Sequence, residues 1–116
     1  MSLRKSRAAL EEAEKNLSVE AFDSCVTSSY MAMFHAGRAI LYRDGMREKS
    51  HYCLARYLEL YVERRELEQR WVDILDRIRD VRHAGHYDLS HSSTAEEAES
   101  CLEASKQFLG IMEQLF

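Results

Sequence analysis

Apolar side chains recur every three or four positions along most of this chain, which is the spacing of an amphipathic α-helix. The first such segment covers about residues 2–16. The second begins after Ser18, which we expect to cap it, and ends at Gly45, because glycine is favoured just beyond a helix C-terminus. Its predicted core face comprises Phe22, Val26, Tyr30, Met33, Phe34, Gly37, Ile40 and Leu41.

Three further helices are predicted. The third follows the polar loop of residues 45–50, and a charged turn at residues 63–66 separates it from the fourth, whose apolar positions run from Leu67 to Val81. The fifth opens at Thr94, because Thr-Ala-Glu-Glu there has the pattern of a capping box.

Composition narrows the fold class. Proline is absent and glycine occurs only four times, which excludes the turn-rich sequence of a β-sandwich or barrel. With 46% hydrophobic and 31% charged residues, the chain is able to fold around one core. We predict an all-α protein, an up-and-down antiparallel bundle of about five helices that forms a single domain over residues 1–116.

Charge and cysteine usage limit the partners. The formal net charge of −4 means that any RNA contact must come from a local basic patch or from a surface shared by two copies. Cys25, Cys53 and Cys101 are widely spaced within helical patterns, which indicates core positions in a reducing compartment. No segment approaches the roughly 20 apolar residues of a membrane span. We expect a cytoplasmic protein with no membrane contact, metal or cofactor.

Candidate chemistry gathers in residues 77–87, Arg-Ile-Arg-Asp-Val-Arg-His-Ala-Gly-His-Tyr. A guanidinium carries a permanent charge and a planar fork of donors suited to phosphate, and an imidazole titrates near neutral pH. Arginine and histidine together, without paired carboxylates or cysteines, favour phosphodiester chemistry over metal binding.

The helical phase orders these side chains. With Ile78 at zero and 100° per residue, Arg82 lies at about 40°, His86 at about 80° and Arg79 at about 100°, along one edge of the buried face. Arg82 and His86 are neighbours, whereas Arg79 is about 10 Å of helix rise from His86. Arg79 and His86 therefore contact the same phosphate only if Gly85 breaks the helix or if a second copy of the protein supplies one of the two groups. We favour the second arrangement, a site composed of residues from both copies of a dimer.

A structural reading stands beside this one. Arginines on a charged helix commonly pair with neighbouring carboxylates, here Asp76 or Asp80, and a histidine near a helix C-terminus interacts favourably with the dipole. His35 and Tyr42 on the second helix are expected to be packing residues.

The second predicted helix resembles a sequence that is typical of a known domain family. Residues 28–41, Ser-Ser-Tyr-Met-Ala-Met-Phe-His-Ala-Gly-Arg-Ala-Ile-Leu, resemble the signature helix of the HEPN domain family, of the type YYAMFHAARALL. Gly45 with residues 49–51 resembles that family's G…K-[ST]-H connection, and residues 104–109 resemble its final helix. Arg82-x-x-x-His86-Tyr87 falls where one branch has R-x-x-A-D-Y.

The resemblance implies a helical bundle, usually dimeric, that is often encoded beside a minimal nucleotidyltransferase in a toxin–antitoxin pair. Ribonuclease members carry an arginine, a polar residue and, after four to six intervening positions, a histidine. Six positions, of which the polar Asp80 is the first, separate Arg79 from His86 and satisfy this pattern, whereas only three separate Arg82 from His86. In such toxins, a tyrosine two residues after the histidine is the target of nucleotide modification by the partner. Here Tyr87 follows His86 directly.

The predicted site thus comprises Arg79, Arg82 and His86 as catalytic residues, and Arg79, Arg82, Tyr87 and Asp80 as nucleotide- or RNA-binding residues. The first hypothesis is a toxin-type protein that cleaves RNA without a metal in a homodimer. The second is a non-catalytic nucleotide- or RNA-binding module that partners a minimal nucleotidyltransferase antitoxin. A third, a structural adaptor, predicts that the arginines are held in intramolecular pairs.

Overall fold

Five α-helices make up the fold in the computed structural model, which describes residues 2–46, 51–87 and 93–115. Within the helices, the side chains of residues 2, 51–52 and 81–87 lie outside the described part. The helices are α1 (Ser2–Ser18), α2 (Phe22–Arg43), α3 (His51–Glu63), α4 (Gln69–Tyr87) and α5 (Ala95–Leu115). The predicted all-α bundle of five helices is confirmed.

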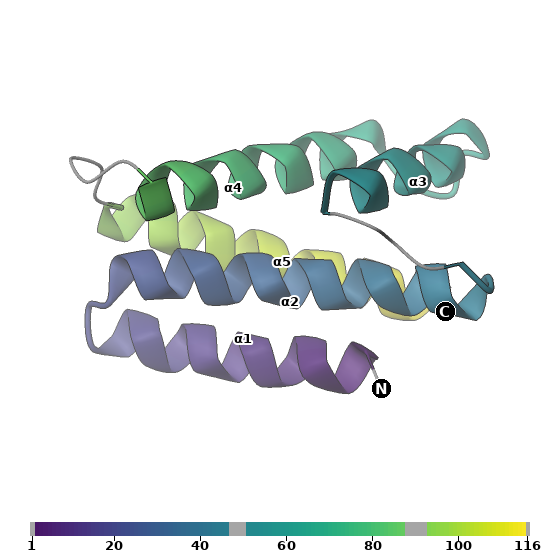
Figure 1. The fold of residues 1–116 in the computed structure, drawn as a ribbon. Coiled ribbons are helices and arrows are strands. Elements are labelled where there is room, and N and C mark those ends of the chain that lie inside the picture. Colours follow the sequence, from purple (N-terminus) through teal and green to yellow (C-terminus); the bar gives the residue numbers. More distant parts are fainter. Residues whose placement is uncertain (1, 47–50, 88–92, 116) are drawn as a thin grey trace.

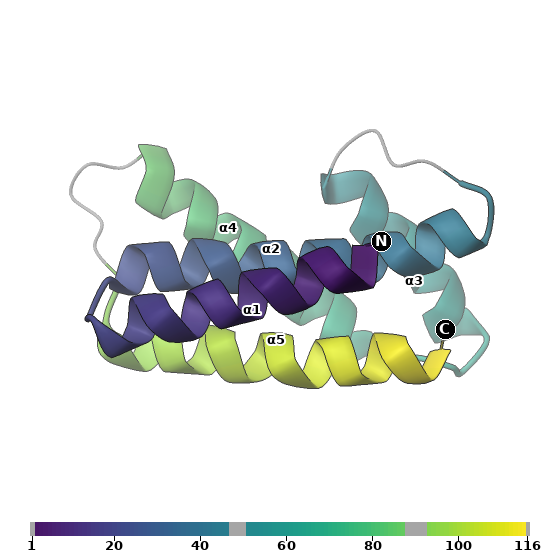
Figure 2. The ribbon, with the colours of Figure 1, turned by 90° about the horizontal axis from the view of Figure 1, so that it is seen from below.

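The helices form two layers on a central pair. Figure 1 shows α2 and α5 side by side, with α1 against one face of the pair and α3 and α4 against the other. α1 and α4 run in one direction, and α2 and α5 run in the other. Figure 2 shows that α4 crosses this pair obliquely, so that its C-terminal end moves away from α5.

Small side chains bring α1 and α2 close together. Ser6, Ala9 and Ala13 are the buried positions of α1, and the Ser6 hydroxyl donates a 2.6 Å hydrogen bond to the carbonyl oxygen of Ala32. Small residues let two helix backbones approach, and the hydrogen bond satisfies a hydroxyl that burial would otherwise strip of water. This contact fixes the N-terminal helix together with Leu3, Leu10 and Leu17, which are partly buried against the core.

Large side chains fill the space between the central pair and the layer formed by α3 and α4. The Trp71 and Phe108 rings lie 5.9 Å apart at a tilt of 50° and join α4 to α5. Gly37 of α2 receives Leu54 of α3, since a Cβ at position 37 would lie 3.0 Å from a Leu54 methyl carbon. The remaining large, fully buried side chains are Tyr30, Tyr61, Met33, Ile40, Leu58, Leu75, Met112, Val26 and Val72.

Two of the three predicted helix-end signals are confirmed. Gly45 has φ +78°, and the Met46 and Gly45 amides donate to Leu41 and Tyr42 in the pattern of a Schellman motif. The Thr94 hydroxyl accepts a 3.1 Å hydrogen bond from the Glu97 amide at the start of α5.

The Ser18 cap was predicted wrongly. Ser18 is the last residue of α1, and its hydroxyl donates backward to the Lys15 carbonyl oxygen at 2.7 Å. α2 begins four residues later, at Phe22, and its N-cap residue Ala21 makes no side-chain cap. Leu67, predicted within the fourth helix, is instead buried in the turn before α4. Leu67 therefore anchors the connection rather than the helix.

The cysteines divide into two kinds. Cys25 and Cys101 are buried, and burial raises the pKa of both thiols, to about 11 for Cys101. Both are therefore protonated core residues at neutral pH, as predicted. Cys53 is exposed, which corrects its predicted core position, because it faces away from the side of α3 that contains Leu54 and Leu58.

Candidate functional site

α4 carries the predicted Arg/His cluster on one continuous helix. The helix runs from Gln69 through Gly85 to Tyr87, so the glycine does not break it. Trp71 and Ile78 are buried and mark the core side that the phase predicted. The side chains of Arg82, His86 and Tyr87 lie outside the described residues, and their roles stay predictions based on position along α4.

Arg79 is paired within its own helix. Its guanidinium lies 3.5 Å from the Asp76 carboxylate and 3.4 Å from the Asp80 carboxylate, and the side chain is 26% exposed. Both carboxylates are the partners that the structural reading named. Asp80 is 73% exposed and makes only a solvated contact, whereas Asp76 is 25% exposed and makes the more protected one.

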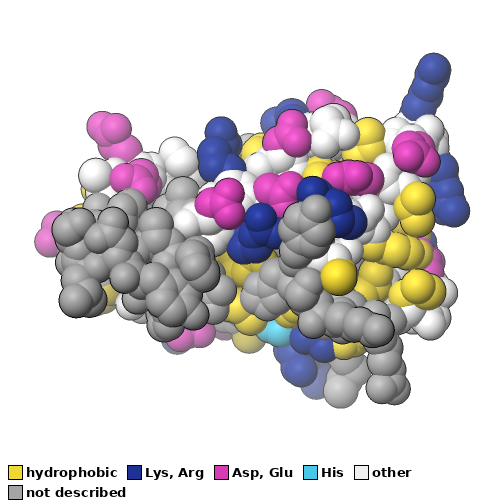
Figure 3. Space-filling view, turned by 45° about the horizontal axis from the view of Figure 1, so that its top comes forward, with side chains coloured by type: hydrophobic (Ala, Val, Ile, Leu, Met, Phe, Trp, Pro, Cys, Tyr) yellow, Lys and Arg dark blue, Asp and Glu magenta, His cyan; other side chains and the backbone are white. Residues whose placement is uncertain are grey.

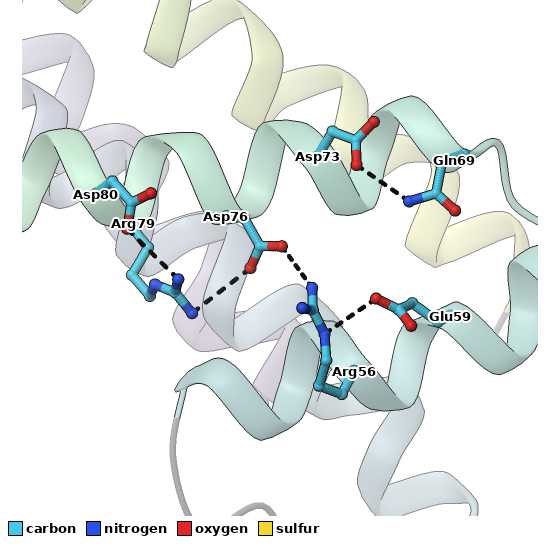
Figure 4. Close-up of polar contacts among 7 residues, drawn as sticks. All are labelled: Arg56, Glu59, Gln69, Asp73, Asp76, Arg79 and Asp80. Atoms are coloured by element: carbon cyan, nitrogen blue, oxygen red, sulfur yellow. Dashed lines mark hydrogen bonds and ion pairs between the residues drawn. The ribbon is translucent and has the colours of Figure 1, made fainter.

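Asp76 also ties α4 to α3. Its second oxygen pairs with the Arg56 guanidinium, which in turn lies 3.0 Å from Glu59 on α3. Figure 4 shows the resulting chain, which runs from Glu59 through Arg56 and Asp76 to Arg79. We call these four residues the α3–α4 clasp. Figure 3 shows acidic and basic side chains interspersed across this face of the molecule.

The clasp limits what Arg79 does in a single copy. Its guanidinium already faces two carboxylates, and the unbroken helix keeps it about 10 Å of rise from position 86. Positions 82 and 86, one turn apart, lie next to each other on the helix surface. Position 82 is therefore nearer to position 86 along α4 than position 79 is, although the family spacing favoured Arg79.

A second polar cluster, which the sequence did not reveal, joins the ends of three helices. Asp44, just past α2, accepts hydrogen bonds from the hydroxyls of Tyr57, at 2.6 Å, and Tyr61. Arg43 donates to the Tyr61 oxygen at 2.8 Å and to the carbonyl oxygen of Leu115 at the end of α5. Tyr57 and Tyr61 share the spacing of the apolar residues Leu54 and Leu58 on α3, so periodicity gives no sign that their hydroxyls have a common partner.

This cluster shifts the pKa of its members. The hydrogen bonds from Tyr57 and Tyr61 lower the pKa of Asp44, because they stabilise its carboxylate. Burial and the neighbouring carboxylate raise the pKa of Tyr57 to about 12 and raise that of Tyr61. All three groups thus hold one protonation state through neutral pH, which suits a structural tie between helix ends.

A shallow groove of about 620 Å³ lies where α4 diverges from α5. Ile74 and Ile78 of α4 and Cys101 and Ala104 of α5 form its apolar floor, and polar groups such as Arg77 and Glu97 stand among the lining residues. The amphipathic pattern did not reveal it, because the groove depends on the angle at which α4 crosses α5.

None of the helices in the described residues combines the length and the apolar character that crossing a membrane requires. A comparison with curated proteins finds no match. A comparison with family models does find one: the HEPN domain matches residues 1–115, which is nearly the full length of the chain. The match agrees with the five-helix bundle and with the signature residues of α2. This chain belongs to the HEPN domain family.

Proposed function

We propose that this HEPN protein is the toxin-type member of a toxin–antitoxin pair and cleaves RNA without a metal ion. The observation that supports it most directly is the unbroken course of α4 through Tyr87. In a continuous helix, positions 82 and 86 are one turn apart, here near the C-terminal end of α4. An arginine and a histidine so placed provide a phosphate ligand and a proton-transfer group.

In this mechanism His86 removes the proton from a ribose 2′-hydroxyl or donates one to the leaving 5′-oxygen. The 2′-oxygen attacks the adjacent phosphorus and the bond to the 5′-oxygen breaks. Arg82 binds the non-bridging phosphate oxygens and stabilises the charge that develops on them. Arg79, oriented by Asp76 with Asp80 beside it, contributes a second positive charge, and Tyr87 hydrogen-bonds or stacks on a base.

Two copies are needed for the full set of groups. Helix rise separates Arg79 from His86 within one copy, whereas two α4 helices facing each other across a two-fold axis bring both sets into one cleft. Mixed dimers of Arg82→Ala and His86→Ala chains test this arrangement. Mixed dimers should regain cleavage that neither homodimer shows, and a mixture as inactive as its parents would argue against a shared cleft.

A second, non-catalytic function is favoured by the pairing of Arg79 with two aspartates, an intramolecular pairing that the structural-adaptor hypothesis also predicted. In this alternative the protein binds nucleotide or RNA, catalyses nothing and partners a minimal nucleotidyltransferase antitoxin. Co-purification with such a partner, together with RNA binding but no cleavage, would support it.

A further inference from the structure

One edge of α2 presents a cation and an aromatic ring outside both the core and the α4 cluster. Met31, His35, Arg38 and Tyr42 follow one another at steps of four, three and four, which places them along one line of the helix. The first three side chains are half-buried and Tyr42 is exposed. We call these four residues the α2 stripe.

Arg38 is held between two aromatic rings. Its guanidinium carbon lies 5.3 Å from the centre of the Phe34 ring and 4.9 Å from the centre of the Tyr42 ring. One of its nitrogens also donates to the Tyr42 hydroxyl. Stacking of this kind fixes the plane of a guanidinium, and the N–H donors along its edge are the groups that grip phosphate. The cation is therefore ordered before any ligand arrives.

Tyr42 adds an apolar surface beside this cation. It is 42% exposed, and Met46, one turn further along, is 49% exposed, so two of the four most exposed large apolar side chains among the described residues lie at this end of α2. A nucleobase stacks on such a ring whatever its sequence, whereas its phosphate requires a positive charge nearby. An aromatic face next to an ordered arginine provides both.

The stripe also lies along a path from the candidate site. Figures 1 and 2 show α4 ending level with the N-terminal half of α2 along the bundle, whereas α3 begins level with its C-terminal half, which contains Arg38 and Tyr42. A strand that follows α2 away from the end of α4 therefore reaches the stripe several nucleotides later.

We propose that the α2 stripe binds single-stranded RNA, with Arg38 contacting a phosphate and Tyr42 stacking on a base. This inference rests on the proposed function, which supplies RNA as the ligand, and adds the surface that holds the strand outside the cleavage site. RNA is favoured over a protein helix because the centre of the stripe is a stacked cation rather than a continuous apolar strip.

The test is the dissociation constant for a short fluorescein-labelled oligouridylate with 2′-O-methyl riboses, which removes the attacking hydroxyl and so separates binding from cleavage. Arg38→Gln and Tyr42→Leu should each raise the dissociation constant about tenfold, whereas Tyr42→Phe keeps the ring and should bind nearly as well as wild type. Arg70→Gln is the matched control, because Arg70 also stacks on an aromatic ring, that of Trp71, at 4.5 Å. Thermal unfolding of each variant verifies the fold.

The outcomes separate this inference from the proposed function. If wild type binds the oligonucleotide but Arg38→Gln and Tyr42→Leu bind it equally well, the stripe is not the RNA surface, and the proposed function is unaffected. If those variants keep RNA binding but lose a partner protein, the stripe is a protein-docking surface and the inference is overturned. If wild type binds no RNA, both proposals fail.

Discussion

The guanidinium of Arg79 lies 3.5 Å from the carboxylate of Asp76, one turn earlier on α4, and Asp76 in turn pairs with Arg56 of α3. The arginine that best matches the family spacing is therefore also part of a tie between two helices. Its neighbour Arg82 lies one turn from His86. The predictions below separate these two arginines and the structural clusters around them.

Arg82→Ala should reduce RNA cleavage more than Arg79→Ala does. Loss of a group that stabilises transition-state charge typically costs about 10²–10³-fold in rate. Arg79 is partly neutralised by Asp76 and Asp80, so we expect its loss to cost no more than about tenfold. Single-turnover cleavage rates of the two variants measure this, and a larger loss in Arg79→Ala would reverse the assignment.

Asp76→Asn should destabilise the protein by about 1 kcal/mol, because the α3–α4 clasp loses the carboxylate that holds two arginines. Urea unfolding measures the change. Glu68→Gln is the control, since it removes a far more exposed pair with Arg70, and should leave the free energy of unfolding nearly unchanged. Equal changes in the free energy of unfolding from the two variants would mean that the clasp stabilises the fold no more than an exposed surface ion pair does.

Gly37→Ala and Gly110→Ala should change stability in opposite directions. An alanine at position 110 meets nothing within 4 Å and should stabilise α5 by about 1 kcal/mol. At position 37 the new Cβ would lie 3.0 Å from Leu54, so overpacking should outweigh the helix propensity and cost about 1 kcal/mol net. Thermal unfolding of both variants provides the comparison, and stabilisation by Gly37→Ala would show that Leu54 moves aside easily.

Stability should depend on pH through the Asp44 cluster. The pKa of Asp44 is lowered in the fold, so its contribution is present above the ordinary carboxyl pKa and is lost as the pH falls through the folded value. The pKa of Tyr57 is raised from 10.0 to about 12, so its contribution is present below pH 10 and is lost as the pH rises toward 12.

Urea unfolding across pH measures both effects. Asp44→Asn should flatten the acid side of the profile, and Tyr57→Phe should flatten the alkaline side. A profile in Asp44→Asn that retains the full acid loss of wild type would place the titrating carboxylate elsewhere.

Much of this fold follows from local rules, which is why the helices were predictable. The steps of three and four identified the core face of α2, and the chemistry of Gly45 and Thr94 defined two helix ends. The prediction for Ser18 was wrong because its hydroxyl is able either to cap the following helix or to bond within the preceding one. It donates to the carbonyl oxygen of Lys15, in the last turn of α1. Helical periodicity carries no information about that choice.

The tertiary contacts were harder to foresee. The pairing of Asp76 with Arg79 is local and was anticipated, but the contact of Asp76 with Arg56 depends on how α3 packs against α4. The convergence of Tyr57 and Tyr61 on Asp44 likewise needs the turn after α2 to bring distant residues together. Such contacts depend on the crossing of helices, which residue spacing does not specify.

Metal-free RNA cleavage by the purified protein, measured with chelator present and beside His86→Ala, tests the central claim most directly. The account predicts that cleavage persists in chelator and is lost in His86→Ala, because the histidine moves the proton that chemistry without a metal requires. Wild type and His86→Ala that are equally inert at high protein concentration would contradict it, as would cleavage of equal rate in both.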